Sequence, residues 1–243
     1  MTRIVELLRE RLVLFFPDQH LDDDAHLAFA LRLGTPYVHP IGRVLGRTDA
    51  SVEHIVDDAE HPPFQDGWHT DVSWDPQPPV FGTVRAIELP SAGGDTIWSS
   101  MYAAYDALSP AMQTMLDGLE AHHDMGAGAA FVSKAGAEVA ARTREAFPGA
   151  THPVVRVHPD TGRRYLYVNA GFTRALAGFA DDESAVLLRI LFRHAQSPNF
   201  QVRHSWTVGE VAVWDERVTQ HFAVADHYPN RREMGRVPVR LAG

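Results

Sequence analysis

The chain of 243 residues contains no cysteine. This absence excludes disulfide bonds, thiolate metal sites and cysteine nucleophiles, so any metal would be held by His, Asp or Glu. The 14 histidines make such a site worth looking for. The chain also lacks an apolar stretch of membrane-spanning length. Its N-terminus, MTRIVELLRERLVLFF, lacks the small-residue cleavage site of a signal peptide. We therefore expect a cytoplasmic protein with no membrane partner.

Basic residues are in the minority, 22 against 31 acidic ones, which gives a net charge of −9. They form no run, so the sequence predicts no nucleic-acid partner. Apolar residues make up 45% of the chain, as is usual for a globular protein. Without a repeat or a linker, this length predicts one domain over residues 1–243.

Short β-prone runs separated by turn signals dominate the sequence. They predict strands at residues 12–16, 52–56, 80–89, 96–99, 154–158, 165–168, 200–206, 211–214, 219–224 and 234–241. Helices are expected near the N-terminus, after the capping residues 22–24, over 101–119 with an interruption at Ser109-Pro110, and over 181–194. Because no βαβ alternation is present, we predict a mainly β fold with flanking helices, a sandwich or barrel.

Two helical segments carry more specific expectations. In residues 181–194, the spacing of Val186, Leu187, Ile190 and Leu191 predicts that these four side chains form the buried face. Residues 125–149 are small and rich in Ala and Gly, with weak helical character over 136–146. Such a segment is a candidate mobile lid over a site.

The pattern His-x-Asp occurs at Trp68-His69-Thr70-Asp71. In a strand, residues i and i+2 point to the same face, so this pattern can place an imidazole and a carboxylate on one ion. With a second His, the set would cover one face of an octahedron and leave three positions free, which suits Fe(II).

The spacing alone is weak evidence, because the pattern occurs four times. His20/Asp22 stands at a helix start, where Asp serves as a cap. His158/Asp160 stands at a hairpin turn, where Pro159 and Asp160 serve the turn. The third alternative, His122/Asp124, can belong to a structural polar network or a pocket wall. For His69 and Asp71 themselves, the structural alternative is a polar edge strand.

Four segments in a fixed order resemble the taurine/2,4-D-type (TauD/TfdA) 2-oxoglutarate dioxygenases. They are WHTDVSW (68–74), LPSAGGDTIWSSM (89–101), HPVVRVHPDTG (152–162) and VAVWDERVTQHFAVADHYPNRREMGRV (211–237). The resemblance extends over nearly the whole chain from about residue 12. It implies a double-stranded β-helix (jelly roll), a bound Fe(II), and 2-oxoglutarate and O₂ as co-substrates.

Carried over by position, the resemblance implies that His69, Asp71 and His221 are the iron ligands. Thr96 and Arg232 would hold the far carboxylate of 2-oxoglutarate, for which a guanidinium fork is well shaped. Without the resemblance, Arg232 would be interpreted as part of a solvated basic edge strand.

The resemblance also implies three substrate-binding residues: Arg236, His39 and Gln65. Arg236 lies an even number of residues after Arg232 and should face the same cavity, where it would hold a substrate anion. The alternative for His39, which precedes a proline, is a structural role. The taurine enzyme has a Tyr where this chain has Gly42, which predicts a wider or more apolar pocket than taurine needs.

These implications predict an enzyme that hydroxylates a small organic anion, an alkyl sulfonate, alkyl sulfate or carboxylate, with release of succinate and CO₂. The alternatives are a non-redox metal hydrolase or isomerase that uses the same triad, and a non-catalytic jelly roll. Members of the family usually begin with some tens of further residues, including a strand. If that strand is absent, a sheet edge is unpaired, and we expect a homo-oligomer, a dimer or tetramer, to cover it.

Overall fold

The computed structural model describes residues 1–63, 67–126 and 136–241. Its largest sheet has six antiparallel strands in the order β1-β12-β4-β14-β2, with β3 also paired to β14. The strands are β1 (Val13–Phe16), β2 (Thr35–Pro36), β3 (Glu53–Asp57), β4 (Phe81–Glu88), β12 (Val211–Asp215) and β14 (Arg232–Arg240). A three-stranded antiparallel sheet has the order β11 (Gln201–His204), β5 (Thr96–Ser100) and β13 (Thr219–Ala223).

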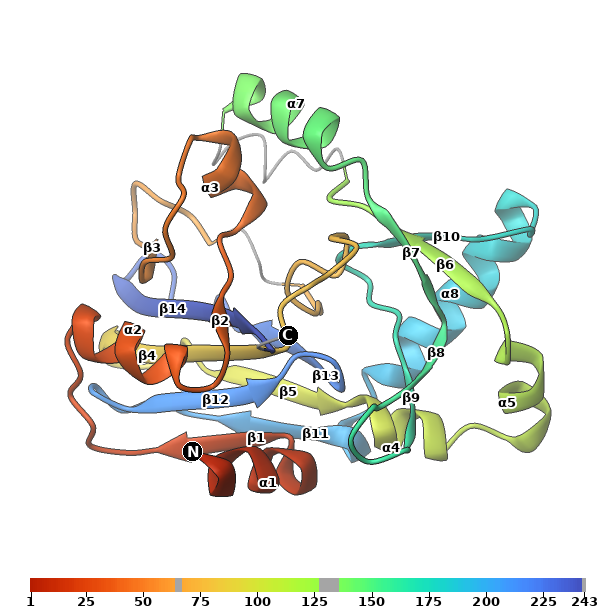
Figure 1. Cartoon of the computed structure of the whole chain (residues 1–243), viewed down its shortest axis with the longest axis horizontal. Helices are drawn as coiled ribbons and strands as arrows, with labels where there is room; N and C mark the ends of the chain where they lie inside the picture. The colour runs from red at the N-terminus through yellow and green to blue at the C-terminus, as the bar shows by residue number, and fades with distance from the viewer. Residues whose placement is uncertain (64–66, 127–135, 242–243) are drawn as a thin grey trace.

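The alternation of β12 determines what each face of the larger sheet packs against. Val213 points outward, into an apolar cluster with Leu8 of helix α1 (Thr2–Arg11) and Ala30 of α2 (Asp23–Leu31). Trp214 points inward, where it packs with Trp98 of β5. Helices therefore cover one face, and the smaller sheet lies against the other (Figure 1).

The rest of the molecule is a second group of strands and helices. Strands β6 (Glu120–His123), β7 (Ala150–Pro153) and β10 (Thr173–Leu176) form a sheet, and β8 (Val155–Val157) pairs with β9 (Arg164–Leu166). The helices here are α4 (Met101–Asp106), α5 (Pro110–Leu116), α8 (Asp181–Ala195) and the 3₁₀ turn η1 (Pro198–Phe200). Figure 1 shows α8 beside β10, away from the larger sheet.

The predicted mainly β architecture with flanking helices is confirmed, but the predicted buried face of α8 is partly wrong. Leu187 and Leu191 are buried as expected, whereas Val186 and Ile190 are each 47% exposed. The buried stripe of α8 instead continues through Leu188. The true stripe is therefore rotated by about one residue, 100° around the helix.

The candidate lid is described only in part. Helix α7 (Ala137–Ala146) coincides with its predicted helical section, and residues 127–135 lie outside the described part of the chain. Helix α7 lies beside α3 (Pro40–Val44), where Arg142 donates a hydrogen bond to the carbonyl of Val44 (2.9 Å; Figure 1). Within the described ranges, every helix is too short or too polar to span a bilayer.

Candidate metal centre and adjoining pocket

His69, Asp71 and His221 come together although about 150 residues separate them in the sequence. One donor atom from each lies within 4.8 Å of the other two, and all three residues are buried. The backbones of His69 and His221 bind each other through two hydrogen bonds of 3.0 and 2.8 Å, which places their side chains together at the edge of β13. The expected strand geometry is only partly correct, because Asp71 lies in a turn, followed by Val72 at a φ of 51°.

Both imidazoles can offer a ring nitrogen to a cation. Nδ1 of His69 donates to the carbonyl of Gly67 (2.7 Å), a hydrogen bond that leaves the lone pair of the neutral ring on Nε2. That Nε2 is buried and has no hydrogen-bond partner among the described residues. Burial, with His69 beside it, lowers the pKa of His221 to about 3 and keeps its ring neutral.

The Asp71 carboxylate is held in its ionised form. Burial opposes ionisation, but Arg236 and the two imidazoles hold its pKa well below the usual range. Its backbone N–H donates to the Glu216 carboxyl (3.1 Å), which is fully buried. Burial, together with the Asp71 charge, raises the pKa of Glu216 well above its usual value. Of the two carboxyl groups, Asp71 is therefore the one that is ionised and can serve as a charged metal ligand.

These donors fit a divalent metal ion. Two imidazoles and one carboxylate form the facial set that non-haem Fe(II) sites use, and Nε2 of His69, which has no hydrogen-bond partner in the described part of the chain, lies 3.4 Å from the Asp71 carboxylate. Among the residues that the structure describes, this is the single group of three or more such side chains with metal-binding geometry.

The other His-x-Asp pairs lie elsewhere. His20 is exposed and bonds to Asp18, while His122 and Asp124 stay 3.8 Å apart on the surface. His158 is buried, but its Nε2 lies 3.3 Å from Asp215.

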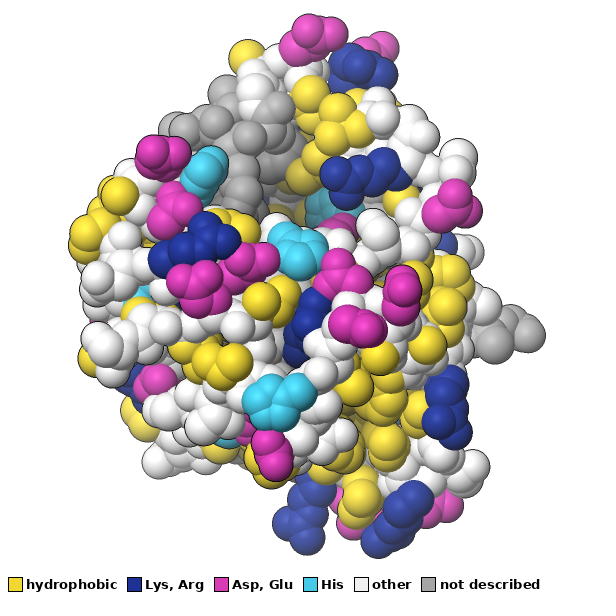
Figure 2. Space-filling model, turned by 90° about the vertical axis from the view of Figure 1, so that its left-hand side faces the viewer, with side chains coloured by type: hydrophobic (Ala, Val, Ile, Leu, Met, Phe, Trp, Pro, Cys, Tyr) yellow, Lys and Arg dark blue, Asp and Glu magenta, His cyan; other side chains and the backbone are white. Residues whose placement is uncertain are grey.

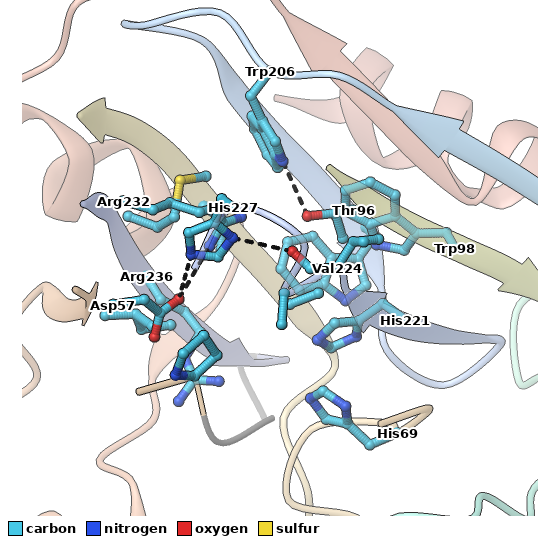
Figure 3. A pocket seen from close by; sticks show the side chains of 17 residues that line it. Asp57, His69, Thr96, Trp98, Trp206, His221, Val224, His227, Arg232 and Arg236 are labelled. Carbon is cyan, nitrogen blue, oxygen red and sulfur yellow. Dashed lines mark hydrogen bonds and ion pairs between the residues drawn. The ribbon is translucent and has the colours of Figure 1, made fainter. Parts of the chain in front are cut away.

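A pocket of about 690 Å³, including its open mouth, extends from His69 and His221 between the two sheets. Its far part contains Arg232 and Thr96 (Figure 3). Nε of Arg232 donates to the carbonyl of Gly94 (3.1 Å), and its Nη1 lies 4.0 Å from Asp57. Gly94 has a φ of 76°, and a Cβ there would stand 2.9 Å from the Arg232 side chain. The glycine therefore permits this close approach.

Thr96 is oriented to donate a hydrogen bond. The indole N–H of Trp206 donates to its Oγ1 (3.0 Å; Figure 3). Because an indole is a donor only, the Thr96 hydroxyl hydrogen remains available to an acceptor in the pocket.

Arg236 lines the same pocket as Arg232, as the even strand offset predicts. Its guanidinium joins two carboxylates: Nη1 donates to both oxygens of Asp71 (3.1 and 2.9 Å), while Nε and Nη2 donate to Glu53 (3.2 and 2.8 Å). Burial would lower the pKa of Arg236, but the two carboxylates outweigh it and raise the value above its usual range.

The structure does not place the other two predicted substrate residues among the described residues that line the pocket. His39 caps α3, its Nδ1 accepting from the N–H of Ile41 (3.2 Å), and burial lowers its pKa to about 4. Gly42 is absent from the pocket lining, and a Cβ there would meet Arg47 at 3.3 Å. The inference of a wider pocket therefore gains no support from this position. Gln65 lies outside the described residues.

Sequence reasoning missed several polar residues of the site. Asp57 and His227 lie beside Arg232, with Nε2 of His227 at 3.6 Å from Asp57 (Figure 3). Glu53 and Glu216 flank Arg236 and Asp71. Asp57 and Glu53 stand at the two ends of β3, opposite Arg232 and Arg236. Asp57 and Glu53 could have been predicted only from the pairing register of β3 with β14, and the sequence does not give that register.

Comparison with known proteins agrees with this arrangement. Residues 1–237 match the family described as "Taurine catabolism dioxygenase TauD, TfdA family". An α-ketoglutarate (2-oxoglutarate)-dependent sulfate ester dioxygenase of Pseudomonas putida is 34% identical, over 98% of this chain and 78% of that protein. An alkylsulfatase of Acinetobacter baylyi is also 34% identical, over 99% of this chain and 76% of that protein.

Solved structures give the same result. The crystal structure of a taurine dioxygenase from Burkholderia xenovorans superposes with a TM-score of 0.79 at 33% identity, covering 98% of this chain and 80% of that one. The predicted double-stranded β-helix, or jelly roll, is thereby confirmed. The chain belongs to the TauD/TfdA family of 2-oxoglutarate-dependent dioxygenases and is an oxidoreductase.

Proposed function

We propose that this enzyme is an Fe(II)- and 2-oxoglutarate-dependent dioxygenase that hydroxylates a small organic anion and releases succinate and CO₂. The observation that carries the proposal is one pocket with the His69, Asp71 and His221 cluster at one end and a buried arginine, Arg232, at the other. A hydrolase or isomerase that used the same triad would need no site for a dicarboxylic co-substrate.

His69, Asp71 and His221 would hold the iron. When bound, Fe(II) supplies the activation of O₂ that is coupled to oxidative decarboxylation of 2-oxoglutarate. The protein prepares the site by lowering the pKa of His221, by holding the Asp71 carboxylate in its ionised form, and by orienting His69 through the hydrogen bond of its Nδ1 to the carbonyl of Gly67.

Arg232 and Thr96 would bind the far carboxylate of 2-oxoglutarate. Arg232 is buried, and its Nη1 lies 4.0 Å from Asp57, beyond hydrogen-bond distance. The guanidinium can therefore meet an entering carboxylate, while Thr96 adds its free O–H. Both side chains lie in the part of the pocket that is far from the metal cluster. They would therefore orient the co-substrate with its keto acid end toward the metal.

For the substrate, we propose an alkyl sulfate or sulfonate, or else a carboxylate, oxidised at the carbon next to the heteroatom. Arg236 would hold the anionic group, and His39 and Gln65 would be the further substrate-binding residues that the family resemblance implies. Trp98, Trp214 and Met234 give the pocket apolar walls for an alkyl chain. The names of the two relatives, a sulfate ester dioxygenase and an alkylsulfatase, support this class.

The test of the metal assignment compares His69→Ala, Asp71→Ala and His221→Ala with His122→Ala, which lies in a His-x-Asp pair of the same spacing. The three ligand variants are expected to lose Fe(II) binding and succinate release, whereas His122→Ala keeps both. Iron loss in His122→Ala with retention in His69→Ala would reject the assignment. Substrate turnover with Zn(II), without 2-oxoglutarate or succinate formation, would favour the hydrolase instead.

A further inference from the structure

The guanidinium of Arg236 has almost no hydrogen-bonding capacity left for a substrate. It has five N–H bonds: one on Nε and two on each Nη. Nε and one N–H of Nη2 go to Glu53, and Nη1 serves both oxygens of Asp71. A single N–H, on Nη2, remains. A substrate anion could not make a bidentate contact with Arg236 while both carboxylates stay in place.

The two carboxylates differ in how easily they can leave. The Asp71 side chain is 3% exposed and is fixed by its position beside His69 and His221. The Glu53 side chain is 22% exposed and is absent from the residues that line the pocket. Water can therefore solvate Glu53 after it leaves Arg236, whereas it cannot reach Asp71 in the same way. Glu53 is the partner that can yield.

Exchange keeps the charge around Arg236 constant. Glu53 is ionised beside Arg236, which holds the pKa of Glu53 below its usual value despite burial. An anion that replaced Glu53 would leave the total charge beside Arg236 unchanged, because one negative group leaves as another arrives.

We propose that Glu53 is a resident competitor for Arg236, and that the anionic group of the substrate binds by displacing the Glu53 carboxylate from the guanidinium. This inference rests on the proposed assignment of Arg236 as the anion-binding residue. It makes Glu53 a specificity-determining residue. To gain a net binding advantage, an incoming anion must bind Arg236 better than the Glu53 carboxylate that is already in contact with it.

The variant that tests it is Glu53→Gln, which has the same shape but no charge. Its matched control is Glu233→Gln on β14, whose carboxylate bonds to His54 and Arg231 and does not contact Arg236. The protein is loaded with Mn(II) and 2-oxoglutarate under anaerobic conditions, so that no turnover occurs. Calorimetry then measures the binding of hexyl sulfate and of uncharged 1-hexanol, with Mn(II) affinity measured in parallel to show that the metal site is unchanged.

Glu53→Gln is expected to tighten hexyl sulfate binding roughly fivefold. The substitution removes a partly exposed ion pair that competes with the substrate for Arg236, and a pair of this kind should weaken substrate binding by about this factor. Binding of 1-hexanol should not change, and Glu233→Gln should behave as the wild type. Hexyl sulfate binding that is unchanged or weaker in Glu53→Gln, but lost in Arg236→Ala, would overturn the competition while leaving the anion site intact. Unchanged binding in Arg236→Ala would reject the anion site itself, and with it this inference. Succinate release tests the dioxygenase activity separately.

Discussion

At the scale of single residues, Arg232 and its neighbour Arg231 provide a matched pair. The Arg232 side chain is 5% exposed and faces the pocket, whereas Arg231 is 43% exposed and pairs with surface carboxylates. Arg232→Ala is expected to weaken 2-oxoglutarate binding by about 2–5 kcal/mol, because it removes one side of a buried charge pair. Arg232→Lys should recover only part of this, since a point charge cannot make the bidentate contact.

The measurement is a 2-oxoglutarate titration of the metal-loaded protein, with Arg231→Ala as the control that should bind like the wild type. Equal affinity in Arg232→Ala and wild type would show that the far carboxylate binds elsewhere.

How far the sequence predicts single residues depends on whether a local rule applies. The even offset between Arg232 and Arg236 correctly predicts that both line one pocket, because strand alternation is a local property. Their partners Asp57 and Glu53 could not be predicted, because these contacts depend on the register of β3 against β14. The meeting of His69 with His221 likewise required the family resemblance, since no pattern within either segment specifies it.

At the scale of elements, the capping residues of helices can be predicted from the sequence more reliably than their buried faces. Asp22 caps α2 and Ser109 caps α5, as their positions predict. The buried face of α8 was misassigned because Leu187, Leu188 and Leu191 form as good a stripe as the one chosen with Val186. Which stripe packs inward depends on the surface beneath the helix, and the helix sequence does not contain that information.

Helix α2 carries a titratable contact that should make the fold sensitive to acid. His26 is buried, and its Nε2 donates to Oγ1 of Thr83 (2.9 Å), which itself donates to the carbonyl of Val237. Nδ1 has no partner among the described residues, so a second proton would be buried without an acceptor. Burial, with Arg85 nearby, lowers the pKa of His26 to about 4 from the model-peptide value of 6.5.

A lowered histidine pKa means that the neutral ring stabilises the fold above pH 6.5, and that this stability is lost as the pH falls toward 4. The loss from this one residue is about 3 kcal/mol at most. His26→Gln, which keeps a donor for Thr83, should flatten part of the decline in unfolding free energy across this range. Denaturant melts at several pH values measure it, with His20→Gln at the exposed surface as the control. An equally steep decline in both variants would contradict the assignment.

At the scale of the whole molecule, charges of both signs mix on the face drawn in Figure 2. Acidic, basic and histidine side chains lie next to one another there instead of gathering into an area of one sign. The absence of a nucleic-acid partner stays a prediction from the sequence. The single domain and the homo-oligomer stay predictions. Light scattering would show the latter as twice or four times the chain mass of 27.0 kDa.

The metal site should act on the stability of the entire fold. Its three residues join the turn after His69 to β13, and through Arg236 to β14. A metal ion that binds only the folded chain stabilises it by mass action, about 2.7 kcal/mol at a hundred times the Kd. For a chain of this size, that corresponds to a rise in Tm of roughly 5–10 °C. Arg236 already pairs with Asp71 and compensates its charge when no metal is bound. The metal-free protein should therefore fold.

Thermal melts with Mn(II) or anaerobic Fe(II), reversed by a chelator, measure this rise. Asp71→Ala should melt at the same temperature with and without metal. Asp124→Ala, which changes the carboxylate of the His122 pair, should keep the full shift. 2-Oxoglutarate should add a further shift only after the metal is present, because in the proposed arrangement Arg232 and Thr96 would bind one end of the co-substrate and the metal would bind the other. A shift of equal size in Asp71→Ala would place the metal elsewhere in the molecule. A 2-oxoglutarate shift without metal would mean that the far end of the pocket binds the co-substrate alone.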